Sequence, residues 1–298
     1  MSIVSLWIPF TLIGAAGQVA RNAMQRGLTG PLGTLGATHI RFLFGLPFAV
    51  LFLIGIVLTN GDWLGWPLSG FWPWLVIGGM AQIVATALML AAMNERSFVV
   101  TTAYLKTEAI QAAIFGFVFL SDHLTVQKVI AILLATLGVV ITALRPGGAK
   151  GFGNLRPTLL GLISASFFAL SAVGYRGAIL NVPNVSFVTA ASFTLAMTLA
   201  MQTIVMSAYL LARKPGVMSS IFRLWKPSMF AGFMGAFASL FWFLAFALTA
   251  AANVRTLALV EVLFAQAAAY WGMKQALSPR ELSGVALILL GVGLLVAG

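Results

Sequence analysis

The chain contains no cysteine and very little charge. Of its 298 residues, 17 are Lys or Arg and 6 are Asp or Glu, so that only 8% are charged. A soluble globular domain carries roughly 25% charged residues, and this chain therefore cannot cover a water-facing surface. The absence of cysteine excludes a disulfide-stapled secreted fold. A disordered chain is excluded as well, because such chains are poor in apolar residues.

Motifs of several common chemistries are also missing from the sequence. It has no G-x-x-x-x-G-K-[ST] phosphate loop, so ATP does not drive the protein directly. His39 and His123 are isolated and no H-E-x-x-H pattern occurs, which argues against a metal site. No acid, base and nucleophile converge, so we expect neither an enzyme nor a bound cofactor.

Long apolar runs dominate what is present. Hydrophobic residues make up 61% of the chain and the mean hydropathy is +1.03. A helix crosses a bilayer core in about 20 residues, and the runs do not alternate as the strands of a membrane β-barrel would. We therefore predict an all-α integral membrane protein with ten transmembrane helices, at residues 4–25, 34–58, 71–94, 98–120, 125–144, 156–178, 185–211, 227–250, 255–274 and 279–297.

The second half of the chain repeats the first at an offset of 153 residues. In this register Leu124-Thr125 aligns with Leu277-Ser278, Gly138-Val139 with Gly291-Val292, and Glu108 with Glu261. The glutamate match is the informative one, since these are the only two acidic residues well inside the expected spans. The pattern predicts a first five-helix repeat at 1–145, a linker at 146–155, and a second five-helix repeat at 156–298.

An odd number of helices per repeat inserts the second half upside down. Inverted repeats provide two exchangeable arrangements around a site near the midplane, which is how many secondary transporters work. The repeat thus favours a transporter over a channel or a receptor, whose long extramembrane loops are missing here.

The basic residues predict the orientation in the membrane. The net charge of +11 indicates cytoplasmic loops rather than nucleic-acid binding. Loops after odd-numbered spans hold eleven Lys and Arg, whereas loops after even-numbered spans hold three: Lys128, Arg176 and Arg255. Under the positive-inside rule, both termini are expected outside the cytoplasm.

The ten expected helices, the five-plus-five repeat and the short loops resemble the EamA-type branch of the drug/metabolite transporter superfamily. The most specific local pieces are the ends of the repeats, Glu108 to Gly138 and Glu261 to Gly291. The resemblance implies secondary export of small metabolites, often amino acids including aromatic ones, across a bacterial-type inner (plasma) membrane. Members of that branch generally place both termini in the cytoplasm, and the loop charges of this chain depart from that pattern.

Polar residues inside the expected spans are the candidates for a substrate pathway. Ionisable side chains inside a membrane are costly, and they usually face the bundle interior or a watery cavity. Glu108 and Glu261 could take up a proton or bind a substrate ammonium; each could instead lock two helices as an ion pair. The full candidate set is Gln18, Arg21, Asn22, Gln82, Tyr104, Glu108, Gln111, Tyr175, Ser239, Trp242, Glu261 and Gln266.

Helical spacing groups some of these candidates. Gln18, Arg21 and Asn22 share one face, as do Tyr104, Glu108 and Gln111, whereas Lys106 is expected to point elsewhere. Arg21, Arg41 and Lys106 are counter-ion candidates that could also snorkel to the interface. Every polar group named is equally consistent with hydrogen bonding between helices as packing support.

Several cargoes and one other class remain open. We expect a small-molecule substrate, with amino acids first, proton coupling as an option, and a monomer or homodimer in the lipid bilayer without nucleic acid. Nucleotide-sugars, sugar phosphates or cationic drugs are alternatives on the same fold. Phosphorylated cargo would need two or more convergent Lys or Arg, and only Arg21 and Lys106 are expected near the midplane. A lipid scramblase or an intramembrane enzyme is the alternative from another class.

Overall fold

The computed structural model describes residues 3–62, 64–95, 104–143, 155–263 and 279–297. Every element in these ranges is helical, and no strand occurs among them. The elements are η1 (Ile3–Leu6), α1 (Trp7–Leu43), α2 (Leu46–Asn60), α3 (Phe71–Glu95), α5 (Glu108–Leu120), α6 (Val126–Ala143), α8 (Leu155–Ile179), α9 (Phe187–Arg213), α10 (Pro215–Arg223), α11 (Trp225–Leu248), α12 (Ala251–Leu257), η2 (Ala258–Val260) and α14 (Pro279–Ala297).

The helices are suited to a membrane in both length and surface. Within the described residues, six helical stretches are long and apolar enough to cross a bilayer, and α5 and α6 are shorter apolar helices. Large apolar side chains face outward from the bundle, such as Leu58, Phe117 and Leu290, which are 77%, 59% and 63% exposed. Water would make such a surface unfavourable, whereas lipid tails match it. The chain is therefore an all-α protein built for a membrane.

The first helical stretch turns back on itself at Gly33. Trp7–Asn60 forms one apolar helical stretch of 54 residues. Within it, Gly33 has the non-helical backbone angles φ 66° and ψ 172°. This backbone region is open essentially only to glycine. Gly33 lies in the gap between the expected spans 4–25 and 34–58, although helix continues through Pro31 up to this break.

Other predicted boundaries agree within a few residues where they can be compared. Spans 71–94, 125–144, 156–178 and 279–297 correspond to α3, α6, α8 and α14. The expected span 34–58 is interrupted at Phe44 and Gly45, between α1 and α2, and Pro47 lies in the first turn of α2. Most of the predicted linker 146–155, and residues 264–274 of the ninth span, lie outside the described residues.

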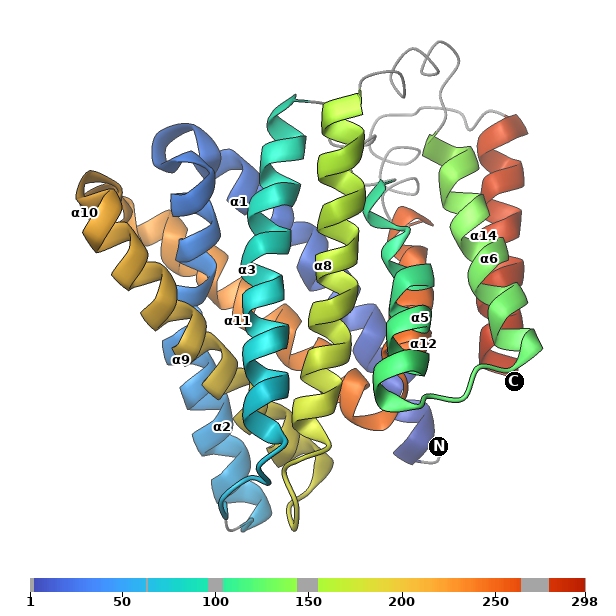
Figure 1. Cartoon of the computed structure of the whole chain (residues 1–298), viewed down its shortest axis with the longest axis horizontal. Helices are drawn as coiled ribbons and strands as arrows, with labels where there is room; N and C mark the ends of the chain where they lie inside the picture. Colours follow the sequence, from blue (N-terminus) through green and yellow to red (C-terminus); the bar gives the residue numbers. More distant parts are fainter. Residues whose placement is uncertain (1–2, 63, 96–103, 144–154, 264–278, 298) are drawn as a thin grey trace.

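Helices that are distant in the sequence pack in pairs (Figure 1). The most extensive packing joins α3 with α8, α1 with α11, and α6 with α14. Small residues allow these approaches: a Cβ on Gly174 would lie 2.7 Å from Cα of Gly78, and a Cβ on Gly17 would lie 3.0 Å from Cβ of Ala238. Without a hydrophobic drive between helices in lipid, close backbone contact of this kind is a main source of association.

Asp62, in the loop between α2 and α3, ties that loop to the segment before α9. Its carboxylate accepts hydrogen bonds from the backbone N–H of Ser186 at 3.1 Å and from the Ser186 hydroxyl at 2.7 Å. It also accepts from the Thr189 hydroxyl at the start of α9. The hydrogen bonds from Thr189 and Ser186 hold the pKa of Asp62 below its usual value.

The α6–α14 contact predicts a sharp sensitivity to added volume. A Cβ on Gly138 would lie 2.6 Å from the carbonyl oxygen of Gly284 and 2.8 Å from Ile288. We expect Gly138→Val to force the two helices apart and to destabilise the protein by about 1–3 kcal/mol. Gly293→Val is the matched control, since a Cβ there meets nothing within 4 Å. Thermal melting followed by tryptophan fluorescence in detergent measures both, and equal effects of the two variants would contradict the packing described.

The Asp62 network predicts a pH-dependent contribution to stability. Because the pKa of Asp62 is lowered in the folded protein, its contribution is present above the unfolded value of about 3.9. It is lost as the pH falls through the folded pKa. Asp62→Asn should therefore lower the melting temperature at neutral pH, and the difference from wild type should shrink below about pH 4. A difference that is constant with pH would argue against the carboxylate as its cause.

Candidate functional site

Six ionisable side chains meet in the interior of the apolar bundle. Arg21 and Arg41 lie on α1, before and after the break at Gly33. Lys106 is in the turn before α5, and Glu108 is the first residue of α5. Arg255 is in α12, and Glu261 directly follows η2. All are buried or nearly so. Glu108, at the start of α5, is the most exposed of them, with 13% of its side chain accessible. Charges at such positions are expensive unless they are paired or functional, which makes this the candidate site.

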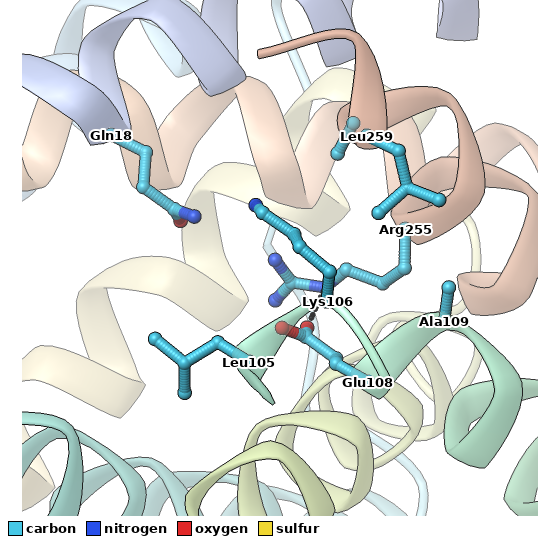
Figure 2. Close-up of a pocket in the computed structure, with 8 residues that line it drawn as sticks. Gln18, Leu105, Lys106, Glu108, Ala109, Arg255 and Leu259 are labelled. Atoms are coloured by element: carbon cyan, nitrogen blue, oxygen red, sulfur yellow. Dashed lines mark ion pairs between the residues drawn. The ribbon is translucent and has the colours of Figure 1, made fainter. Parts of the chain in front are cut away.

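A small pocket lies among these charges (Figure 2). Its lining includes Gln18 of α1, Lys106 and Glu108 near the start of α5, and Arg255 and Leu259 from α12 and η2. The amide of Gln18 points from α1 toward Lys106 and Arg255. The free space is about that of one ordered water molecule, so the pocket is closed in this conformation.

Two ion pairs cross between the two halves of the chain. Lys106 pairs with Glu261, and Nε of Arg255 lies 2.6 Å from Oε1 of Glu108. Glu108 and Glu261, which the sequence repeat aligns with each other, are thus each ion-paired with a basic side chain from the other half. Both pairs are within the low-dielectric interior, where loss of one partner would leave an uncompensated charge.

Lys106 corrects one sequence expectation. On a continuous helix it would point away from Glu108, but Lys106 and Thr107 form a turn and α5 begins only at Glu108. The turn brings Lys106 and Glu108 to the same pocket. The span predicted at 98–120 therefore has a non-helical break in its middle, which residue spacing alone could not indicate.

Arg255 is the site residue that sequence reasoning missed. It was counted as a loop residue after the eighth span, but it lies in α12 with 8% of its surface exposed. Its guanidinium stacks over Trp242 at 4.6 Å and over Phe246 at 5.3 Å from the ring centres. The interruption of helix at Thr249 and Ala250 allows the chain to turn inward at this depth. Arg176, also counted as a loop residue, is in α8 and donates to the carbonyls of Phe246 and Thr249.

Arg41 belongs to a second polar network beside the pocket. It donates to the Ser239 hydroxyl at 3.2 Å and, with the Gln82 amide oriented to satisfy both neighbours, to the Gln82 oxygen at 2.8 Å. The Gln82 nitrogen then donates to the Tyr175 hydroxyl, which also accepts from Gln202 at 3.2 Å. Arg41 is 3% exposed, so snorkelling to the interface is wrong for this residue.

The other candidates fall into two groups. Arg21 lies in the interior and donates to the Asn22 amide oxygen at 2.9 Å, and Trp242 supports Arg255. Tyr104 instead faces α8, where its hydroxyl accepts from Thr158 at 2.9 Å, and Gln111 of α5 donates to Thr107 in the turn before that helix. Gln266 lies outside the described residues. Gln202 was not predicted, although a lone amide within an apolar span is the signal that could have found it.

Comparison with known proteins defines the fold but no family. No family model matches the chain, and no curated protein matches it. Among solved structures, 28 chains match. One of them, described only as "Crystal structure of protein", has a TM-score of 0.69 at 16% sequence identity and covers 99% of this chain and 98% of its own. This similarity extends over the whole chain and concerns the fold alone.

The Glu108–Arg255 pair predicts non-additive effects on stability. Either Glu108→Gln or Arg255→Gln alone leaves one buried charge without its partner and should cost about 3–5 kcal/mol. The double variant removes both charges and should recover part of that loss. A double-mutant cycle of thermal melts measures the coupling; additive losses would show that the two side chains do not depend on each other.

Proposed function

We propose that the protein is a secondary-active or facilitated transporter that moves small solutes across a membrane by alternating access. The observation that carries the proposal is the pocket closed by two ion pairs, each of which joins one half of the chain to the other. A rocking of the halves would break these pairs, open the pocket to one side, and re-form them around the solute.

The helix pairing supports the two inverted five-helix repeats that this mechanism needs. If the halves are related by a two-fold axis, a contact between the third helix of one half and the first helix of the other must recur with the halves exchanged. The α3–α8 and α1–α11 contacts are such a reciprocal pair, and α6 with α14 and α2 with α9 are pairs of equivalent helices. The break at Gly33 divides Trp7–Asn60 into two crossings, which brings the count of expected helices toward ten.

The positive-inside rule still favours termini outside the cytoplasm. Two of the three basic residues assigned to the outer loops do not count as loop charges, because Arg255 is buried in α12 and Arg176 is partly buried in α8. Only Lys128 remains on that side, which strengthens the charge asymmetry. The proposed location is a bacterial-type inner membrane.

Export of amino acids, aromatic ones included, is the cargo suggested by the resemblance to EamA-type transporters. Trp242 and Tyr175 provide aromatic surroundings for the charged groups: Arg255 lies over the Trp242 ring, and Tyr175 is linked to Arg41 through Gln82. A scramblase or an intramembrane enzyme has less support, because the polar groups are enclosed in the bundle and do not face the lipid.

The test is solute uptake into proteoliposomes that contain the full chain, with and without a pH gradient. Glu261→Gln should reduce uptake at least about tenfold, since it breaks the pair with Lys106. If the buried carboxylates carry a proton, the variant should also lose any stimulation by the gradient. Glu281→Gln, in the first turn of α14, is the control and should transport normally. Lack of transport for every solute tested with the wild-type protein would rule the proposal out.

A further inference from the structure

The buried charges of the site do not balance. Four cationic side chains share the interior with two carboxylates, and both carboxylates are already paired, with Lys106 and Arg255. Arg21 and Arg41 are 2% and 3% exposed. Among the residues whose side chains the structure describes, no carboxylate lies within ion-pair distance of either. The site therefore carries two more positive charges than negative ones, and neither Arg21 nor Arg41 is ion-paired to a described carboxylate.

Both guanidiniums are held by neutral groups. Arg21 donates to Asn22, and Arg41 donates to Ser239 and Gln82. An arginine cannot shed its proton in a protein, so the charge cannot be avoided as it could for a buried lysine. An uncompensated ion in a low-dielectric interior is strongly unfavourable. A bound anion would supply the missing counter-charge.

The two side chains converge on one spot against α11. A Cβ on Gly235 would lie 3.0 Å from Cγ of Arg41 and 3.6 Å from Cδ of Arg21. Ser239 and Trp242 follow at spacings of four and three residues, on the same face of α11 as Gly235. Two buried donors of these residues, Nε of Arg41 and Nε1 of Trp242, have no hydrogen-bond partner within the described residues. Unused donors beside excess positive charge point to a missing anionic acceptor.

This group is continuous with the pocket. Gln18 lines the pocket one helical turn before Arg21 on α1, and Arg255, which lines it from α12, stacks over Trp242. Arg21 and Arg41 therefore lie next to the residues that line the pocket.

We propose that Arg21 and Arg41 form an anion-binding subsite and that the transported solute presents a carboxylate or phosphate group to them. The inference rests on the proposed transport function. It also implies that a substrate ammonium is not required, because Glu108 and Glu261 are both occupied by bases of the chain. Four convergent cations correct the sequence expectation that only Arg21 and Lys106 lie near the middle, which had argued against phosphorylated cargo.

The experiment uses three probes that share one ring and differ in charge: phenylalanine, its deaminated acid 3-phenylpropionate, and its decarboxylated amine phenethylamine. Glycerol 3-phosphate and inorganic phosphate are the phosphate arms, at matched ionic strength. Binding to the purified full chain is read from thermal shifts of tryptophan fluorescence, and transport from uptake into proteoliposomes. We expect shifts and uptake for the acid or for glycerol 3-phosphate, and none for phenethylamine.

Substitutions at Arg41 test whether the anionic probes bind at this side chain. Arg41→Gln should weaken binding of the anionic probes by about tenfold to a hundredfold, as expected for a lost charge-assisted hydrogen bond. Arg41→Lys, whose ammonium is stabilised when an anion binds beside it, should restore part of the binding, a rescue that a purely structural role would not give. Arg213→Gln, on the exposed end of α9, is the control that removes a cation elsewhere. The wild-type probe series remains decisive if Arg41→Gln does not fold.

The outcomes separate the two proposals. Uptake of phenethylamine as strong as that of the acid, or anion binding unchanged in Arg41→Gln, overturns the anion subsite while transport stands. A shift with inorganic phosphate only, without any organic anion, overturns the assignment to cargo. Binding of organic anions that depends on Arg41, without transport of any of them, supports the subsite and counts against the transport function.

Discussion

The cost of placing charge inside an apolar bundle governs this structure. A chain with so few acidic residues uses two of them, Glu108 and Glu261, deep within its helices. Each meets a base from the opposite half of the chain. Separating an ion pair in a low-dielectric interior is costly. The two pairs therefore hold the two halves of the chain in this relative position. The pocket lies beside these two pairs, which join the turn before α5 and the start of α5 to α12 and to the residue after η2.

Close helix packing makes this arrangement possible. Glycine and alanine at the α3–α8, α1–α11 and α6–α14 crossings bring backbones together with little side-chain volume between them. The polar side chains then reach across the bundle at hydrogen-bonding distance, as Gln202 does to the carbonyl of Gly79 at 2.9 Å. In the absence of a hydrophobic drive within lipid, small-residue contacts and buried polar bonds are complementary sources of stability.

Much of the fold could be predicted because its signals are local and strong. Apolar runs of bilayer length predicted the positions of α3, α6, α8 and α14. Glu108 and Glu261 could be identified as candidates because acidic residues inside the expected spans are so rare. Prediction failed where the backbone leaves the helix. The turn at Lys106 and the inward chain after Thr249 each redirect a side chain or a whole segment. Arg255 was missed for that reason: the sequence shows a cation near a span end, and only the tertiary path places it beside Trp242.

The excess of positive charge connects the site to its motion. A ligand shifts a conformational equilibrium only by its differential affinity for the two states. With no anion present, closing the bundle places Arg21 and Arg41 in a dry interior without counter-charge, and water in an open state would solvate them better. A carboxylate or phosphate bound between them would remove that penalty and favour closure. On the proposed mechanism, the same two arginines that select the cargo would also make closure depend on its presence, and the cross-half ion pairs would then re-form around a loaded site.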